Sequence, residues 1–436
     1  MNEGVRGEAP SDFVGFRVNP AWQGRSANLG FVRRFRRSFL VAAMILVELA
    51  ILPILVVRAF VARLFRKRID AGFGPDPLIN NVHHRKAMEL AGYSAQTFCI
   101  EPSFITGAFD RVFVTGARTG VTRLVCLFVG RIRCAWWVLG QFHVLYTSFV
   151  GGPLAPMVFL ARIEPFLLRL ADVRTVMLPY GGDVHVPERL SNLAFRFALD
   201  FDYPKSFMRS THVRRRVAVW TKHADCVLAG CDWVDCLDHC DVLCYSHFAI
   251  DETQWDAVAP TPPAEFTAAR PLRILHAPNH RAIKGTDAFV AAVEQLRSEG
   301  CHIELHLMER QSNDSVKAAI QSVDVVADQL IIGWYAMFAI EGMAMRRPVL
   351  CHLRNDLLAL HEAAGTAPQG GFPLVRCDCA SVGSAIRDLY RNPGRIPEAG
   401  ECGRKFVEHH HSLAAGARLF RMIQCRLGIE PTRECP

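Results

Sequence analysis

The sequence predicts an α/β protein in which two doubly wound parallel sheets follow an apolar helix near the N-terminus. Strand-like apolar stretches alternate with helical ones, joined by short connections, from about residue 72 onward. A proline-rich segment at 260–263 divides this pattern, and an apolar run occupies residues 38–57. The 436 residues, 50% of them hydrophobic, are enough for two cores. We expect five segments: a basic flexible tail (1–37), a membrane-associated apolar helix (38–60), two Rossmann-like domains (72–262 and 263–410), and a C-terminal helix and tail (411–436).

Most of the net positive charge of the chain lies in its first 70 residues. The formal charge is +8, and residues 1–70 hold twelve Arg and Lys against five Asp and Glu, so +7 of it lies there. A nucleic-acid-binding protein would carry its basic residues as a patch on the folded domains. Here they flank the apolar run, so the sequence predicts a membrane surface as the partner, through residues 33–68, and no nucleic acid.

The apolar run at 38–57 allows three interpretations. Twenty helical residues span about 30 Å, the thickness of a hydrocarbon core. Glu48 near the middle and Pro53 late in the run disfavour a simple lipid-exposed span, and arginines on both flanks leave its orientation open. A single span, a helix in the interface and a buried core helix remain, with membrane association favoured because a core helix needs no basic flanks. The 15 cysteines suit a reducing compartment, and we expect the cytoplasmic side of the membrane, with peripheral or single-span attachment.

A second apolar stretch occupies residues 119–140. Its length would also allow a membrane span, but Arg123, Arg131 and Arg133 are distributed through it. We therefore expect a packed amphipathic helix at this position.

The first α/β half offers one candidate ligand turn. A predicted strand at 174–178 runs directly into a glycine turn with Gly181, Gly182 and Asp183. Ligands of open α/β sheets bind at the carboxyl ends of the strands, where the two glycines would let a substrate approach the backbone. Asp183 would then accept a bond from a substrate hydroxyl, or it would be the N-cap of an ordinary strand-to-helix turn. The residues alone do not decide between these interpretations.

The second half contains two candidate positions. Arg281 and Lys284 lie in a loop between a strand at 272–277 and a helix that begins near residue 287, so their charges and the helix dipole would converge on one anion such as a diphosphate. Glu341 lies about two turns into a later helix and could bind paired hydroxyls such as those of a ribose. The alternative for Lys284 is a solvated surface lysine.

Metal-binding and cofactor-binding motifs are weak. Cysteines cluster between residues 226 and 244, but they lack the paired C-x₂-C spacing of a zinc site. Asp200 and Asp202 form a D-x-D, which follows a helical stretch and not a strand end. The sequence contains no G-x-G-x-x-G and no P-loop motif, which argues against a dehydrogenase or a P-loop NTPase. We expect no metal and no resident cofactor.

These segments resemble the GT-B-fold glycosyltransferases, specifically the large retaining family 4. The resemblance covers about residues 75–425 and is most specific at 272–350. It implies two facing Rossmann-like domains, an acceptor domain followed by a donor domain. It also implies transfer of a sugar from a nucleotide-diphosphate donor to a lipid-linked or envelope-glycan acceptor, as in hexosyltransferases, with retention and without metal. The segments that carry the resemblance are 180–184 (YGGDV), 274–278 (ILHAP), Lys284-Gly285-Thr286, 328–344 (DQLIIGWYAMFAIEGMA) and Arg347-Pro348-Val349.

Carried over by position, the resemblance assigns roles to several residues. Lys284, beside Gly285, would hold the donor diphosphate, and Glu341 would hold the ribose. The backbone of Tyr335, Ala336 and Met337 would face the phosphates. Arg281 and Lys284 would neutralise the departing diphosphate, and Asp183 would contact the acceptor.

The chain departs from the family pattern at three positions. The usual phosphate-binding Arg is replaced by Asn279, so that Arg281 is the nearest arginine. Tyr180 replaces a His, and Gly333 stands where the family has the first Glu of its E-x₇-E motif, with Asp328 or Gln329 as possible substitutes. An alternative function is therefore a catalytically impaired GT-B-fold protein that binds glycan or nucleotide.

Overall fold

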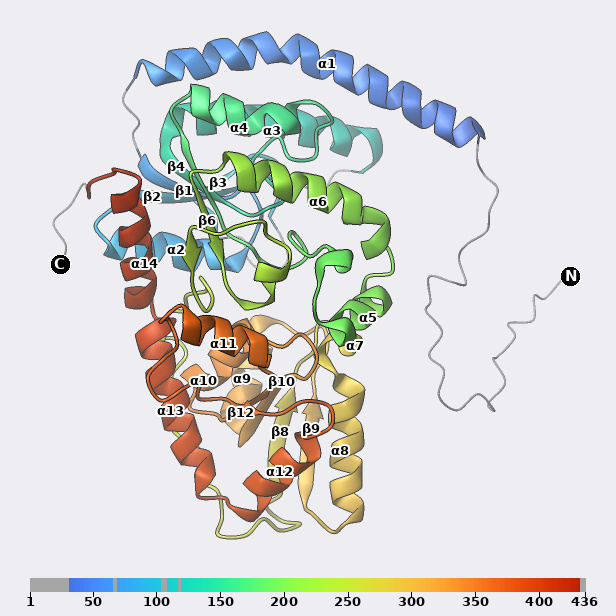
Figure 1. Cartoon of the computed structure of the whole chain (residues 1–436), viewed down its shortest axis with the longest axis vertical. Coiled ribbons are helices and arrows are strands. Elements are labelled where there is room, and N and C mark those ends of the chain that lie inside the picture. The colour runs from blue at the N-terminus through green and yellow to red at the C-terminus, as the bar shows by residue number, and fades with distance from the viewer. Residues whose placement is uncertain (1–30, 66–68, 103–107, 117–118, 432–436) are drawn as a thin grey trace, which may run out of the picture.

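Two parallel sheets organise the computed structural model, which describes residues 31–65, 69–102, 108–116 and 119–431 (Figure 1). The N-terminal lobe contains a seven-stranded sheet in the order β3-β2-β1-β4-β5-β6-β7, the order of a dinucleotide-binding fold extended by one strand. Every pair of neighbouring strands in it is parallel. Its strands are β1 (Ile69–Phe73), β2 (Ala95–Cys99), β3 (Arg111–Val112), β4 (Phe142–Thr147), β5 (Arg174–Met177), β6 (Cys226–Ala229) and β7 (Val242–Leu243).

Helices cover both faces of this sheet. One face packs against α3, α4 and α6, with α1 as an additional outer layer, and the other face packs against α2 and the C-terminal α14. Parallel strands buried on both sides read as near-continuous apolar runs, as the sequence of β4 does. The helices of this lobe are α1 (Phe31–Arg63), α2 (Ile79–Leu90), α3 (Gly120–Gln141), α4 (Leu160–Leu170), α5 (Leu193–Asp202) and α6 (Ser206–His223).

The C-terminal lobe contains a five-stranded parallel sheet in the order β12-β11-β10-β8-β9. Helices α8 and α12 cover one face, and α9, α10, α11 and α13 lie toward the other. Its strands are β8 (Leu272–His276), β9 (Ile303–Leu307), β10 (Val325–Gln329), β11 (Val349–Cys351) and β12 (Val375–Arg376). Its helices are α7 (Arg281–Lys284), α8 (Thr286–Ser298), α9 (Asn313–Ser322), α10 (Met337–Ala344), α11 (Asn355–Ala363), α12 (Val382–Arg391) and α13 (Arg395–His410), followed by α14 (Leu413–Arg426).

Each sheet has one point where its strand order reverses. In the N-terminal lobe this switch point lies between β1 and β4, and in the C-terminal lobe between β8 and β10. Segments that follow the strands of the two sheets contact each other: the Asn80 amide of α2 donates to the Met337 sulfur of α10 (3.4 Å), and the Trp334 ring nitrogen donates to the Tyr245 carbonyl (2.9 Å). The carboxyl ends of the two sheets therefore face one another, and the predicted class of two facing doubly wound sheets is confirmed.

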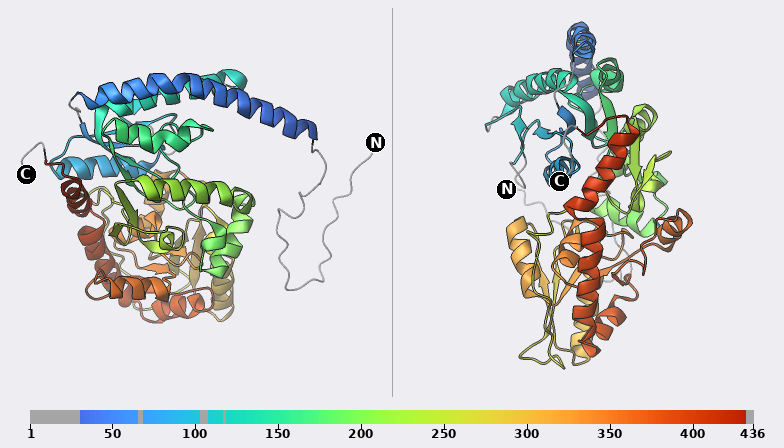
Figure 2. Two further views of the ribbon diagram at one scale, coloured as in Figure 1. Left: turned by 45° about the horizontal axis from the view of Figure 1, so that its top comes forward. Right: turned by 90° about the vertical axis from the view of Figure 1, so that its left-hand side faces the viewer.

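The C-terminal helix returns to the N-terminal lobe. Helix α13 packs on α10 of the C-terminal lobe, and α14 then packs along α2 (Figure 2). A bridge between Ile250 and Ser412 joins the outgoing and returning chain where they cross between the lobes. Helix α14, within the segment expected at 411–436, thus belongs structurally to the first lobe.

Two elements near the N-terminus differ from the expectation. Strand β1 is an inner strand of its sheet, between β2 and β4, although it begins before the predicted domain start at residue 72. The strand could not be recognised from its sequence because Asp70 interrupts the apolar pattern. The buried Asp70 carboxylate accepts bonds from the Ser94 amide and hydroxyl, both at 2.8 Å. Helix α1 begins at Phe31 and not at residue 38, while the predicted tail up to residue 30 lies outside the described residues.

Candidate functional site

A buried ion pair marks the switch point of the C-terminal lobe. Lys284 is the last residue of α7 and Asp328 lies in β10, and the Lys284 Nζ is 2.5 Å from the Asp328 Oδ1. Asp328 is fully buried and the Lys284 side chain is 14% exposed. The buried His276 side chain links β10 to the start of α8, because its ring nitrogens bond the Ala327 carbonyl (2.8 Å) and the Thr286 hydroxyl (2.9 Å). The lysine is therefore a positioned group and not a solvated surface residue.

Glu341 lies beside this pair. It projects from the second turn of α10 and is 9% exposed. Burial raises the pKa of its carboxyl group, the negative charge of Asp328 adds to this shift and the positive charge of Lys284 opposes it, so that the pKa is about 8. The structure thus brings together Lys284 and Glu341, and it adds Asp328, which pairs with Lys284 and whose negative charge acts on Glu341.

The first turn of α10 presents backbone amides next to this cluster. The N-cap residue Ala336 is extended and provides no side-chain cap, and the first amides of a helix have no partner within it. Trp334 and Tyr335 are buried, and the Tyr335 hydroxyl bonds the His411 ring nitrogen (2.9 Å), whereas residues 336–338 are partly exposed. A helix start of this kind favours an anion such as phosphate.

Gly333 has a structural role. Its φ is +93°, and a Cβ at this position would lie 2.4 Å from the Arg354 Cγ. Its amide donates to the Gln329 side chain (3.2 Å), while the Gln329 amide group donates to the Trp334 and His352 carbonyls (3.1 and 2.7 Å). A Glu at position 333 would require a different loop, and the Gln329 side chain is engaged in holding this one.

Two other predicted donor-loop residues, Arg281 and Asn279, are exposed, whereas Gly285 is buried. Arg281 is the first residue of α7, and its guanidinium group pairs with Glu309 (2.9 Å) and Asp287 (3.5 Å), whereas Lys284 contacts Asp328. Asn279 is exposed. Gly285 adopts a left-handed conformation (φ +73°) that joins α7 to α8.

A further contact holds this loop to the N-terminal lobe. The carboxylate of Asp202, part of the D-x-D, accepts a bond from the Ile283 amide at 2.7 Å.

Asp183 stabilises a turn in the N-terminal lobe. Its two carboxylate oxygens accept bonds from the Phe149 and Tyr180 amides, both at 2.9 Å, so it ties the end of β4 to the end of β5. Burial raises the pKa of this carboxyl group. Gly181 supplies the positive φ (+117°) of the turn, and Gly182 is exposed. No helix begins at Asp183, so the N-cap interpretation does not apply.

Two residues at the switch point of the N-terminal lobe were not predicted. Asp76 follows β1, Ser148 follows β4, and the serine hydroxyl donates to the Asp76 carboxylate. Burial raises the pKa of Asp76 and the charge of Asp183 adds to this effect, while Arg131 and Arg216 lower it. An Asp directly after a strand is a signal for such a site, but it is visible only once β1 is recognised.

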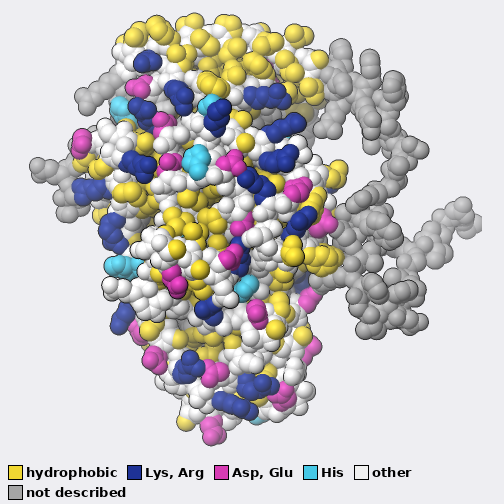
Figure 3. Space-filling model, viewed as in Figure 1, with side chains coloured by type: hydrophobic (Ala, Val, Ile, Leu, Met, Phe, Trp, Pro, Cys, Tyr) yellow, Lys and Arg dark blue, Asp and Glu magenta, His cyan; other side chains and the backbone are white. Residues whose placement is uncertain are grey.

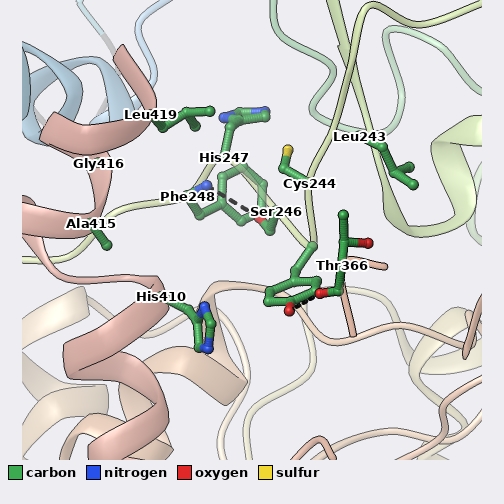
Figure 4. Close-up of a pocket in the computed structure, with 11 residues that line it drawn as sticks. Leu243, Cys244, Ser246, His247, Phe248, Thr366, His410, Ala415, Gly416 and Leu419 are labelled. Carbon is green, nitrogen blue, oxygen red and sulfur yellow. Dashed lines mark hydrogen bonds between the residues drawn. The ribbon is translucent and has the colours of Figure 1, made fainter. Parts of the chain in front are cut away.

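A separate cavity of about 320 Å³ lies where the chain crosses between the lobes (Figure 4). Its walls come from the segment after β7, from Thr366 and from the junction of α13 and α14, and the Tyr245 hydroxyl donates to the Thr366 carbonyl. His247 and His410 also line it, whereas Lys284, Asp328 and Glu341 do not. This cavity belongs to the connection between the lobes.

No protein-family model matches the sequence, and a search of curated proteins finds no match. Similar solved structures include TarM of S. aureus (10% identity, TM-score 0.41), which aligns over 68% of this chain and 59% of that chain. The O-GlcNAc transferase of Thermobaculum terrenum is 13% identical (83% and 68% of the two chains, TM-score 0.41). WaaG, a glycosyltransferase involved in lipopolysaccharide biosynthesis, is 11% identical (81% and 99%, TM-score 0.41).

The chain spans less than two thirds of the length of the TarM structures it matches. Membership of the retaining family 4 stays a prediction, and the roles of Lys284, Asp328 and Glu341 rest on the geometry of this chain.

Proposed function

We propose that this protein is a glycosyltransferase that uses a nucleotide-diphosphate sugar. The observation that carries the proposal is the cluster of Lys284, Asp328 and Glu341 at the switch point of the C-terminal sheet, next to the open N-terminus of α10. A cation and helix amides at one strand end suit a diphosphate, and a carboxyl group beside them suits the hydroxyls of a ribose.

In the proposed reaction, the bond between the anomeric carbon and the diphosphate oxygen breaks, and negative charge accumulates on the departing diphosphate. Lys284 and the first amides of α10 stabilise that charge in a site that is already organised before the reaction. Asp328 holds the ammonium group in position. Facing lobes exclude the water that would otherwise hydrolyse the donor. Retention of configuration without a metal, and a lipid-linked or envelope-glycan acceptor, are part of this proposal.

The setting of the reaction is also proposed. We place the protein at the cytoplasmic side of a membrane, because every cysteine among the described residues is a free thiol and such thiols suit a reducing compartment.

A second candidate function is binding of a nucleotide or glycan without turnover. It is favoured by Gly333, where the positive φ and the contact with Arg354 leave no room for the Glu of the E-x₇-E motif. The variant Gly333→Glu distinguishes the two functions. If Gly333 belongs to a working donor loop, the variant loses thermal stability and gains no turnover; increased turnover would instead show that the natural chain is impaired.

The test of the main proposal incubates the full chain with a panel of labelled uridine, guanosine and adenosine diphosphate sugars and a lipid extract. Release of nucleotide together with transfer of label to lipid or glycan supports a glycosyltransferase. Saturable nucleotide binding without release of label supports the second candidate. Absence of both binding and release across the panel would overturn the assignment of the site.

A further inference from the structure

Helix α1 has one packed face and one exposed apolar face. Glu48, Leu55, Ala59 and Ala62 recur on one side of the helix and are buried against the N-terminal lobe. On other sides, Leu46, Val57 and Phe60 are 68%, 62% and 56% exposed. A helix that is apolar on both its packed and its outer side is unusual on a surface that faces water.

Helix α3 extends this exposed apolar surface. Its second half is packed, as expected for residues 119–140, but its first half exposes Val121, Leu124 and Val125 by 76%, 68% and 55%. Each of Val41–Arg63 and Gly120–Gln141 is long and apolar enough to cross a bilayer by length and composition. The two helices pack against each other, and apolar side chains cover the end of the molecule that α1 occupies, above a row of Lys and Arg (Figure 3). We call the exposed apolar residues of α1 and α3 the docking surface.

A basic cavity of about 420 Å³ lies between the two helices. Arg58, Arg111 and Arg133 line it together with Trp136 and Trp137, and we call it the arginine cavity. The Arg58 guanidinium group lies 5.1 Å from the Trp136 ring, and that of Arg111 lies 4.7 Å from the Trp137 ring. Within the described part of the chain, no carboxylate forms an ion pair with any of these three arginines.

The arginine cavity also depends on a glycine. A Cβ on Gly140 of α3 would lie 1.7 Å from the Arg58 Nη2, so a larger residue at position 140 would displace this guanidinium group from its place against the helix. Arg58 is fixed there by a bond from its Nε to the Trp136 carbonyl (3.1 Å). The cationic group is therefore held at the edge of the docking surface, where tryptophan and arginine suit the level of lipid headgroups.

Glu48 fixes how α1 lies. Its carboxylate accepts bonds from the Val158, Phe159 and Leu160 amides, at 2.9, 2.7 and 2.9 Å, and so caps the N-terminus of α4. If α1 left the lobe to cross a bilayer, these three amides would lose their partner and Glu48 would enter hydrocarbon. The glutamate that disfavoured a simple span in the sequence is thus the residue that holds the helix along the lobe.

We propose that α1 and α3 form a single docking surface that lies flat on a bilayer containing anionic lipids, with the arginine cavity holding a lipid phosphate at its edge. An anionic headgroup supplies the negative charge that the three arginines lack, whereas a second copy of the chain would bring a second set of unpaired arginines. This inference goes beyond the proposed function and does not depend on sugar transfer.

The test measures co-sedimentation of the full chain with vesicles of phosphatidylcholine alone and of phosphatidylcholine with 30% phosphatidylglycerol. The triple variant Arg58→Gln/Arg111→Gln/Arg133→Gln is expected to bind the anionic vesicles on the order of a hundredfold more weakly, since each near-surface arginine contributes roughly a fivefold factor. Its binding to phosphatidylcholine should stay unchanged. Equal binding of the triple variant to anionic vesicles would overturn the phosphate site.

A second variant tests the apolar part of the surface. Leu124→Asp/Val125→Asp is expected to weaken binding to both kinds of vesicle at least tenfold, while Val258→Asp, at an 86% exposed position of the linker, leaves it unchanged. Thermal unfolding in detergent controls for folding, because all these side chains are partly or fully exposed. If the α3 variant converts a dimer into a monomer and vesicle binding persists, the occupant is a second copy and the proposal fails.

Two further measurements distinguish a lipid phosphate from a free phosphate, and a helix that lies on the bilayer from one that crosses it. Soluble glycerol phosphate should compete with anionic vesicles only in large excess; competition at equal concentration would indicate a site for free phosphate and contradict the membrane assignment. An N-terminal affinity tag on protein bound to the outside of sealed vesicles should be fully removed by protease. A protected tag would show that α1 crosses the bilayer.

Discussion

Both lobes carry buried charged side chains near the carboxyl ends of their strands, but these side chains have different hydrogen-bond partners. In the N-terminal lobe, the carboxylate of Asp183 is held by two backbone amides that join neighbouring strands. In the C-terminal lobe, Lys284 pairs with Asp328, and Glu341 lies beside them with a pKa of about 8. A carboxylate satisfied by amides stabilises the fold even where burial raises its pKa, as at Asp183, whereas a buried cation–carboxylate pair with a second carboxyl group beside it is typical of a ligand site. Position at a strand end therefore does not identify a functional residue without its hydrogen-bond partners.

The largest expected effect tests the C-terminal half of this comparison. Lys284→Met should lower kcat/KM for the donor by about 10²–10³, because one preorganised donor to a developing charge contributes roughly this factor. Steady-state kinetics with the donor identified in the panel measures it. The matched control is Lys405→Met, an exposed lysine on α13 of the same lobe, which should change the rate by less than twofold.

Folding has to be separated from chemistry in this experiment, since Lys284→Met leaves Asp328 buried without its partner. The double variant Lys284→Met/Asp328→Asn removes both charges and should unfold near the natural temperature while remaining inactive. A double variant that is active would remove Lys284 from the proposed mechanism.

A second prediction concerns Asp183. Asp183→Ala should lower the free energy of unfolding by about 2–3 kcal/mol, because two buried amides lose a charged acceptor. Urea unfolding measures this, with Asp238→Ala, an exposed carboxylate paired with Arg189, as a control that changes stability by less than about 0.5 kcal/mol. If Asp183→Asn kept full stability and abolished turnover, Asp183 would contact the acceptor, and the contrast between a structural carboxylate in the N-terminal lobe and a ligand site in the C-terminal lobe would be wrong.

A third prediction uses the pH dependence of the N-terminal lobe. Glu164 is buried in α4, accepts a bond from the Leu154 amide (2.8 Å), and has its pKa raised by burial from 4.5 to about 8. Between these values the folded chain keeps a proton that the unfolded chain has lost, so stability falls as pH rises and levels off above pH 8. Glu164→Gln should reduce the fall between pH 5 and 7 by about 2 kcal/mol in urea titrations. An unchanged pH profile would contradict the protonated state of Glu164.

The smallest expected effect concerns Glu341. An ionised carboxylate accepts hydrogen bonds from ribose hydroxyls more strongly than a protonated one, so nucleotide affinity should rise about tenfold as pH increases from 7 to 9, through the pKa of about 8. Calorimetric titration with uridine and guanosine diphosphate measures it. Glu341→Gln should abolish the rise, and a rise that persists in this variant would assign the pH dependence to another group.

Much of the fold could be predicted because it depends on local patterns. The alternation of strand-like and helical stretches and the proline-rich break at 260–263 are visible in the sequence, and they predict two parallel sheets. Strand β1 could not be predicted, since Asp70 breaks its pattern and accepts hydrogen bonds from Ser94, 24 residues away.

The candidate site was predictable in part. Lys284 and Glu341 could be proposed from their places in the chain, and the structure brings them together around Asp328. That Arg281 pairs with Glu309 and Asp287 depends on strand and helix contacts that no spacing reveals. Asp76 and Ser148 were missed because they meet only across the switch point.

The amino-acid sequence by itself determined that there are two sheets and that basic residues flank an apolar helix. It also determined that Lys284 and Glu341 follow strands of the second sheet. Tertiary structure decided which charges are satisfied and which sides of a helix are covered. In the sequence, Glu48 is a charged residue that disfavours a membrane span. In the structure, its carboxylate accepts bonds from three backbone amides at the start of α4. The physical reason is that burial and hydrogen bonding depend on neighbours brought from distant parts of the chain, which periodicity and spacing do not encode.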